Sequence, residues 1–248
     1  MASSSTSVNI SIIVPAFNEE KLIQASLRAM NEALVAFHQL GWGSEIIVCD
    51  NNSTDATAAL AREAGAKVVF EPVNQIGRAR NTGAAAATGD WLIFIDADSH
   101  PSPELFRDVA DAITTGRYLA GGSTVQIDAT DGVAMFITRA WNRLSRVATL
   151  MAGSFIFCER AAFNEVGGFD LQLYASEEID LSKKLKKLAR KRRKKVIILH
   201  RHPLVTSGRK VHLYSHREYL RFFVRNALSL GKNLKSAKHC FPWYDGRR

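Results

Sequence analysis

The sequence predicts a Rossmann-like α/β fold in which a mostly parallel central sheet has helices on both faces. Three observations lead to this prediction. Short runs rich in β-branched residues alternate with helical patterns over the first hundred residues, as in βαβ units. The run 91–95, WLIFI, is apolar throughout, as expected of a buried strand. The length of 248 residues, 46% of them apolar and 23% charged, suits one folded domain and excludes a disordered chain.

Local signals predict the elements of the first half. Between Glu19 and Leu40 the apolar residues recur at spacings of four and three, which indicates an amphipathic helix. A second helix at 56–64 should end at Gly65, because glycine readily adopts the left-handed conformation that closes a helix. A third helix is expected at 78–87. Strands are expected at 10–14, 45–49, 67–70 and 91–95.

The alternation of strands and helices is less regular after residue 100. Ser176 can cap a helix that opens with Glu177 and Glu178, because a serine side chain accepts a hydrogen bond from a backbone N–H group. The sequence shows neither repeats nor a clear linker, so one domain with two lobes that share a sheet is expected. Its further elements are predicted as helices at 103–115, 133–150 and 215–230, extended segments at 118–127, 153–158 and 196–199, and a turn at 167–170.

Bulk features exclude several protein classes. No window reaches the roughly 18 unbroken apolar residues of a membrane span. The N-terminus has neither a basic nor an apolar region of a secretory signal, and residues 1–8 are expected to form a disordered arm. Three isolated cysteines fit a reducing compartment and provide neither a disulfide framework nor a zinc site. These features predict a cytoplasmic protein.

The charge is unevenly distributed along the chain. Residues 1–182 hold 12 basic and 22 acidic residues, a net charge of −10, whereas residues 183–248 hold 21 and 2, a net charge of +19. Such asymmetry suggests a polyanionic partner for the C-terminal quarter, such as a nucleic acid, an anionic membrane or a phosphorylated substrate.

The most distinctive local motif is Asp96-Ala97-Asp98, directly after the apolar strand at 91–95. Two carboxylates at positions i and i+2 should project from the C-terminal edge of the sheet, where open α/β sheets bind ligands. Their mutual repulsion is relieved by a divalent cation such as Mg²⁺ or Mn²⁺ that also binds substrate phosphates. The alternative is a polar turn that caps the next helix.

The other strand ends of the first half also carry polar residues, at Pro15–Glu20, Asp50 and Glu71. Because the strands are parallel, these residues should meet at one crevice. A nucleotide base could lie near Phe17, with Asp50 accepting hydrogen bonds from the base or ribose. Arg78 and Arg80 begin a helix, where backbone N–H groups and guanidinium groups suit a diphosphate. For Arg80 the alternative is an exposed position on a solvated helix face.

Several runs together resemble the family-2 glycosyltransferases with the GT-A fold: SIIVPAFNEE, EIIVCDNNSTDAT, NQIGRARNTGAAAATGDWLIFIDADS, VGGFD and EEIDLSKKL. The resemblance implies a nucleotide-sugar donor bound by residues 9–100, and a smaller acceptor-side lobe within residues 101–248. It also implies sugar transfer with inversion by single displacement, and a Mn²⁺ or Mg²⁺ ion held by Asp96 and Asp98. The predicted donor-binding residues are Pro15, Phe17, Glu19, Asp50, Arg78, Arg80, Asp96 and Ala97.

An acceptor hydroxyl needs a general base, and Glu177, Glu178 and Asp180 are the candidates. Glu177 and Asp180 share one helical face, whereas Glu178 points about 100° away. By motif position, Glu178 replaces the family's catalytic aspartate, and the choice between Glu178 and Glu177 stays open. The alternative is that these acids only favour a helix N-terminus. His202, before a proline, is a candidate third metal ligand, because enzymes of this fold often use a C-terminal histidine.

The basic quarter begins with ten Lys or Arg residues among the thirteen of Lys183–Lys195. Further basic residues alternate with aromatic ones over 214–238, a pattern that suits an anionic membrane interface. An anionic or lipid-linked acceptor, and peripheral attachment to an anionic membrane, are therefore expected. The alternative is a basic nucleic-acid-binding protein built on the same fold. No zinc-finger, RNP or helix-turn-helix signature supports it, so no specific nucleic acid is expected.

Two related enzyme classes fit less well. Sugar-1-phosphate nucleotidyltransferases place a glycine-rich loop after the first strand, where this chain has PAFNEE. Processive polysaccharide synthases carry membrane spans and a Q-x-x-R-W segment, and this sequence has neither. A non-processive transferase that uses a UDP-, GDP- or dTDP-sugar is therefore predicted, with the sugar, base and acceptor undetermined.

Overall fold

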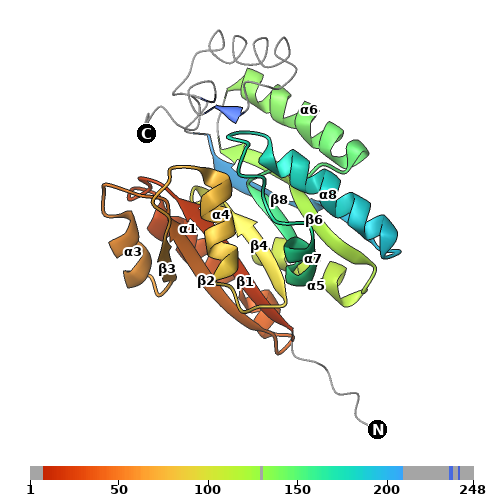
Figure 1. The fold of residues 1–248 in the computed structure, drawn as a ribbon, viewed down its shortest axis with the longest axis horizontal. Coiled ribbons are helices and arrows are strands. Elements are labelled where there is room, and N and C mark those ends of the chain that lie inside the picture. The colour runs from red at the N-terminus through yellow and green to blue at the C-terminus, as the bar shows by residue number, and fades with distance from the viewer. Residues whose placement is uncertain (1–7, 129–130, 209–234, 237–239, 241–248) are drawn as a thin grey trace.

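The computed structural model describes residues 8–128, 131–208, 235–236 and 240. Its centre is one eight-stranded sheet with the order β3-β2-β1-β4-β7-β6-β8-β5 (Figure 1). The predicted α/β fold is confirmed. The expected arm at 1–8 and the helix at 215–230 fall, except for Val8, outside the described residues.

The first half contributes a purely parallel part of the sheet. β1 (Asn9–Ala16) lies between β2 (Gly43–Asp50) and β4 (Trp91–Ile95), and β3 (Lys67–Phe70) continues the sheet beyond β2. The connecting helices are α1 (Ile23–Ala33), α2 (Val35–His38), α3 (Thr57–Glu63) and α4 (Ile76–Ala85). Because all four strands run in the same direction, their C-terminal ends lie at one edge.

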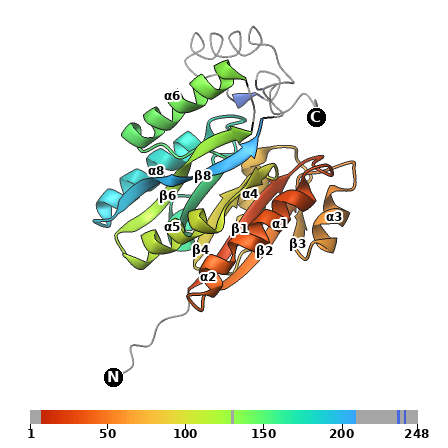
Figure 2. The same ribbon diagram turned by 180° about the vertical axis from the view of Figure 1, so that it is seen from behind.

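The second half extends the same sheet in a mixed arrangement. β7 pairs antiparallel with both β4 and β6, whereas β6 and β8 are parallel and β5 pairs antiparallel with β8 (Figure 2). The two lobes thus share a continuous sheet. The elements are β5 (Ser99–His100), α5 (Pro103–Thr114), β6 (Tyr118–Asp128), α6 (Gly132–Ala148), β7 (Phe155–Glu159), α7 (Arg160–Glu165), α8 (Glu177–Lys191) and β8 (Lys195–Ser207).

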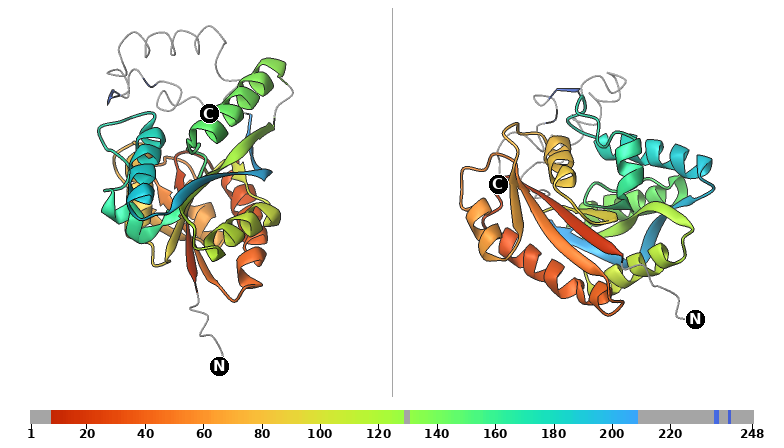
Figure 3. Two further views of the ribbon diagram at one scale, coloured as in Figure 1. Left: turned by 90° about the vertical axis from the view of Figure 1, so that its right-hand side faces the viewer. Right: turned by 60° about the horizontal axis from the view of Figure 1, so that its bottom comes forward.

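The sheet is buried on both faces, as Figure 3 shows. Ile12 of β1 belongs to a core that includes Leu27 of α1 and Phe106 of α5. Its neighbour Ile13 points to the other face and belongs to a second core with Leu185 of α8. Successive side chains of a strand point to opposite faces, so a single strand such as β1 supplies both cores. Helices cover both faces, as predicted.

Several element boundaries differ from those predicted. The helix expected from Glu19 starts only at Ile23, because the backbone carbonyl of Glu19 accepts hydrogen bonds from two N–H groups in a turn. Ser176 occupies the N-cap position of α8, but its side chain makes no capping hydrogen bond and its φ is 64°. The helix expected at 78 begins at Ile76, so Arg80 lies in its second turn.

Two findings concern the cysteines and the membrane-spanning segments considered above. All three cysteines are buried. None of the helices among the described residues is both long and apolar enough to span a membrane.

Candidate functional site

The segments after β1 and β2 are joined by hydrogen bonds at the C-terminal edge of the sheet. The N–H of Asn18 donates to the Ser53 hydroxyl at 3.0 Å, and the N–H of Thr54 donates to the Asn18 side chain at 2.8 Å. The N–H of Glu19 donates to the Thr57 hydroxyl at 2.8 Å. The predicted donor-binding segment at 15–20 is therefore held in place by the loop that follows β2.

Asp50 and Asn51 fix the next part of this edge. Asp50 is buried, and its carboxylate accepts a hydrogen bond from the N–H of Ser53 at 3.1 Å. The Asn51 side chain donates to the carbonyls of Glu71 and Val73 and accepts from the N–H of Gln75 at 2.9 Å. Asn51 thus joins the ends of β2 and β3 to the start of α4. This role was not predicted from the sequence, in which the position of Asn51 next to Asp50 at a strand end is its only signal.

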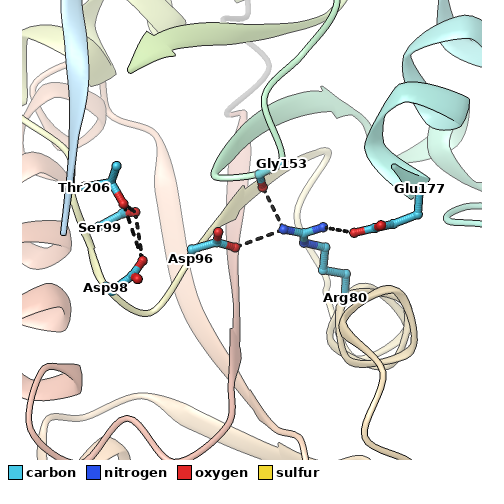
Figure 4. Close-up of polar contacts among 7 residues, drawn as sticks. All are labelled: Arg80, Asp96, Asp98, Ser99, Gly153, Glu177 and Thr206. Atoms are coloured by element: carbon cyan, nitrogen blue, oxygen red, sulfur yellow. Dashed lines mark hydrogen bonds and ion pairs between the residues drawn. The ribbon is translucent and has the colours of Figure 1, made fainter. Parts of the chain in front are cut away.

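Arg80 of α4 lies at the centre of the site (Figure 4). Its Nη1 donates to Glu177 Oε1 at 2.8 Å. Its Nη2 donates to Asp96 Oδ1 at 2.9 Å and to the Gly153 carbonyl at 2.8 Å. One guanidinium therefore connects the carboxylate that follows β4 to the first residue of α8, although these residues are far apart in the sequence.

The burial of Arg80 contradicts the alternative of a solvated helix face. The side chain is only 2% exposed, and its guanidinium stacks over the Phe169 ring at 5.2 Å. Desolvation lowers the pKa of Arg80, but the carboxylates of Asp96 and Glu177 outweigh it and raise this pKa further. Both terminal nitrogens are already bonded within the protein. Arg80 lies in the second turn of α4, not at its first residue, and from there its side chain points toward Asp96.

Glu178 differs electrostatically from its neighbour Glu177. Burial raises the pKa of the Glu178 carboxyl to about 8, and the charge of Glu177 adds to this effect. Glu177 is nearly fully buried in its ion pair with Arg80. Asp180 forms an ion pair with Lys184 one turn along the same helix, at 2.7 Å. The three acids at the start of α8 therefore have three different environments.

Gly153 fits closely between these groups. A Cβ atom at this position would lie 3.3 Å from Arg80 Nη2 and 3.6 Å from the Glu178 carboxyl carbon. Its carbonyl orients Arg80, and its lack of a side chain leaves room for both residues. Gly153 was not predicted as a site residue, because nothing in the local sequence links it to Arg80.

The second carboxylate of the D-x-D motif lies on the other side of the β4 end. Asp98 is 5% exposed, and its Oδ1 is 3.5 Å from the hydroxyls of both Ser99 and Thr206 (Figure 4). The N–H of Ser207 donates to the Asp98 backbone carbonyl at 3.0 Å. The C-terminal part of β8 thus reaches the motif.

The family model described as "Glycosyl transferase family 2" matches residues 11–167, well over half of the chain. The chain belongs to glycosyl transferase family 2. An uncharacterized glycosyltransferase of Mycobacterium tuberculosis is 38% identical over 120 residues, which is 46% of this chain and 50% of that protein. A dolichol-phosphate mannosyltransferase of Pyrococcus furiosus is 30% identical over 124 residues, 47% of this chain and 33% of that enzyme. The chain thus spans half or less of the length of these relatives.

Solved structures confirm the GT-A fold of this glycosyltransferase. A mannosyltransferase from Pyrobaculum calidifontis in complex with GDP-Man and Mn²⁺ superposes with a TM-score of 0.63. The match covers 95% of this chain and 64% of the other, at 18% sequence identity. At this identity the likeness concerns the fold alone.

The donor set at the β4 end of this glycosyltransferase fits a hard divalent cation. Asp96 and Asp98 supply carboxylate oxygens, which Mg²⁺ and Mn²⁺ prefer. Within the described ranges, no group of three or more His, Cys, Asp or Glu side chains is placed to hold a metal. Two carboxylates suffice where substrate phosphates and water complete the coordination, as is usual for Mg²⁺.

His202 is placed away from this donor set. Its Nδ1 lies 3.1 Å from a carboxylate oxygen of Asp108 on α5. The β8 residues that reach Asp98 are Thr206 and Ser207, and an extended strand advances about 13 Å over the four residues from His202 to Thr206. The structure therefore does not bring His202 to the predicted metal ligands. The local sequence could not show which part of β8 faces the β4 end.

The remaining predicted residues flank the same edge. Arg78 is half-buried, and its Nε donates to the Gln75 side chain at 3.1 Å. Gln75 in turn donates to the carbonyls of Leu171 and Leu173, so the start of α4 is fixed to the segment before α8. On the basic stretch, Lys183, Lys187 and the residues from 190 to 193 are exposed.

Proposed function

We propose that this protein is a metal-assisted, inverting glycosyltransferase that moves one sugar from a nucleoside-diphosphate sugar to an acceptor hydroxyl. The observation that carries the proposal is the Arg80 bridge, which joins Asp96 at the donor edge to Glu177 at the start of α8. The GDP-Man and Mn²⁺ in the Pyrobaculum structure support the donor and metal classes. The sequence match over 11–167 supports the reaction class.

The donor would lie along the C-terminal edge of β1, β2 and β4. Asp50 accepts hydrogen bonds from the nucleoside, beside Phe17 and the segment Pro15–Glu19, while Arg78 and Ala97 lie at the diphosphate. A Mn²⁺ or Mg²⁺ ion held by Asp96 and Asp98 would offset the negative charge that develops on the leaving diphosphate.

The acceptor proton would go to Glu178. Glu177 is engaged by Arg80, and Asp180 by Lys184, so neither is as well placed to accept a proton. Glu178, with a pKa of about 8, is a stronger base than an ordinary carboxylate. As it takes the proton, the acceptor oxygen bonds to the anomeric carbon and the diphosphate leaves from the opposite face. The product has the inverted configuration.

The acceptor is proposed to be anionic or lipid-linked. The Lys- and Arg-rich continuation of α8 begins one turn after Glu178, so its charge adjoins the acceptor side. The dolichol-phosphate mannosyltransferase among the relatives supports a lipid phosphate as acceptor class. A cytoplasmic, membrane-peripheral location agrees with these features.

A thermal-shift screen of UDP, GDP and dTDP, each with and without Mn²⁺, tests the donor site. One nucleotide at about 100 times its Kd should add about 2.7 kcal/mol of stability, with a Tm increase of about 5–10 °C. Asp98→Asn should abolish the Mn²⁺-dependent part and should reduce sugar transfer at least 100-fold. Retained transfer in Asp98→Asn with Mn²⁺ present would exclude the metal role, and a product that keeps the donor's anomeric configuration by NMR would exclude inversion.

A further inference from the structure

Helix α6 presents its apolar side to solvent. At 100° per residue, six residues of the helix fall within one arc of about 100°. The five large ones are between 49% and 81% exposed, with Phe136 at 72% and Val147 at 81%. Figures 1 and 2 show α6 at the outer edge of the part of the chain that the structure describes. The apolar arc consists of Val133, Phe136, Ile137, Ala140, Leu144 and Val147.

The side of α6 that faces the protein is small and polar instead. Ala134 and Ser145 are its buried residues. The Asn142 side chain exchanges two hydrogen bonds with the backbone of Val125 on β6, at 2.8 and 3.0 Å. The Ser145 hydroxyl donates to the Leu150 carbonyl at 2.6 Å. Helices of soluble proteins normally turn their apolar stripe toward the core, so α6 is held in the reverse orientation.

The charged residues within α6 all have one sign. Arg139, Arg143 and Arg146 border the apolar arc on one side, and no acidic residue occurs between Gly132 and Ala148. The Lys186 amino group donates to the carbonyl of Ala148, so the basic stretch of α8 adjoins the C-terminal end of α6. An apolar stripe beside clustered cations is the pattern of a helix that lies in an anionic membrane interface.

We propose that α6 docks this protein on an anionic lipid bilayer, with the apolar arc inserted among the acyl chains and the arginines at the headgroups. An antiparallel symmetric contact with a second copy would place the three arginines of one copy next to those of the other. Residues 209–248 carry ten basic and two acidic residues, so covering α6 with them would also bring like charges together. A bilayer that contains anionic lipid supplies both the apolar volume and the opposite charge.

The inference rests on the proposed function, because docking through α6 would bring the acceptor side of the site to a lipid-linked acceptor. The chain runs from the C-terminal end of α6 directly to Gly153, whose carbonyl holds Arg80. Docking through α6 would therefore place the membrane surface close to the start of α8.

Vesicle flotation tests the proposal without donor or acceptor. The wild-type protein should float with vesicles of phosphatidylcholine and phosphatidylglycerol, and much less with phosphatidylcholine alone. The double variant Phe136→Gln/Val147→Gln keeps every charge, and its partition into the mixed vesicles should fall on the order of tenfold or more. Leu40→Gln, at a 53% exposed leucine after α2, is the matched control and should float like the wild type.

Three outcomes would overturn the proposal. The first is a wild type that does not float with the mixed vesicles, or a double variant that floats equally well. The second is a wild-type dimer in light scattering that the double variant converts to a monomer, which would assign the arc to a second copy. The third is a clear loss of thermal stability in the double variant, which would assign it to cover by this chain. A wild-type protein that floats with the mixed vesicles but transfers no sugar would instead refute the proposed function and leave this inference intact.

Discussion

Replacement of Arg80 by methionine tests the central interaction of the site. Arg80 is buried and makes three hydrogen bonds of 2.8–2.9 Å, two of them to the carboxylates of Asp96 and Glu177. Removing one partner of a buried ion pair costs about 3–5 kcal/mol, because the remaining charge stays buried and uncompensated. For a domain of this size, the Tm should fall by about 6–20 °C.

The pH dependence of this loss separates charge from packing. In Arg80→Met, the carboxylates at the site are like charges at close range, and protonation relieves their repulsion. The loss of stability, measured by urea unfolding, should therefore be larger at pH 8 than at pH 5. Arg78→Met, on the same helix with a single hydrogen bond to Gln75, should cost less than about 1 kcal/mol. An equal loss for Arg80→Met at both pH values, or a loss no larger than that of Arg78→Met, would refute the reasoning.

Two further variants test neighbouring parts of the site. Glu178→Gln should slow sugar transfer by about 10²–10⁴-fold, and the wild-type rate should rise with pH toward an apparent pKa of about 8. Because folding raises the pKa of Glu178 from 4.5 to about 8, its contribution to stability is complete below pH 4.5 and is lost as the pH rises through 8. In unfolding experiments Glu178→Gln should thus be more stable than the wild type at pH 9, by at most about 5 kcal/mol, and equal stabilities would contradict the assignment. Asn51→Ala should lower the free energy of unfolding by about 2–4 kcal/mol, because two carbonyls and one N–H lose their partner. The exposed Asn52→Gly is its control, and similar costs for both would show that Asn51 does not organise this edge.

Local patterns predicted much of the fold because they depend on neighbouring residues. The apolar runs predicted the four strands of the first half, and the spacing of three and four predicted the helical segment between Glu19 and Leu40. The position of β7 between β4 and β6, antiparallel to both, could not be predicted in this way. Strand order depends on contacts between distant segments, which no local signal contains. For the same reason, the predicted helix at 133–150 did not show that the apolar side of α6 faces outward.

The sequence by itself determined the family, the alternation of strands and helices, and the placement of acidic residues at strand ends. These properties are encoded in short segments with their own motifs and periodicity. Only the tertiary structure decided which residues meet. It buried Arg80 between Asp96 and Glu177, although Glu177 lies 97 positions after Arg80 in the sequence. It also separated His202 from the D-x-D motif. The physical reason is that a buried charge is stable only beside charged or polar partners. The packing of the sheet decides which residues become those partners, independently of their distance along the chain.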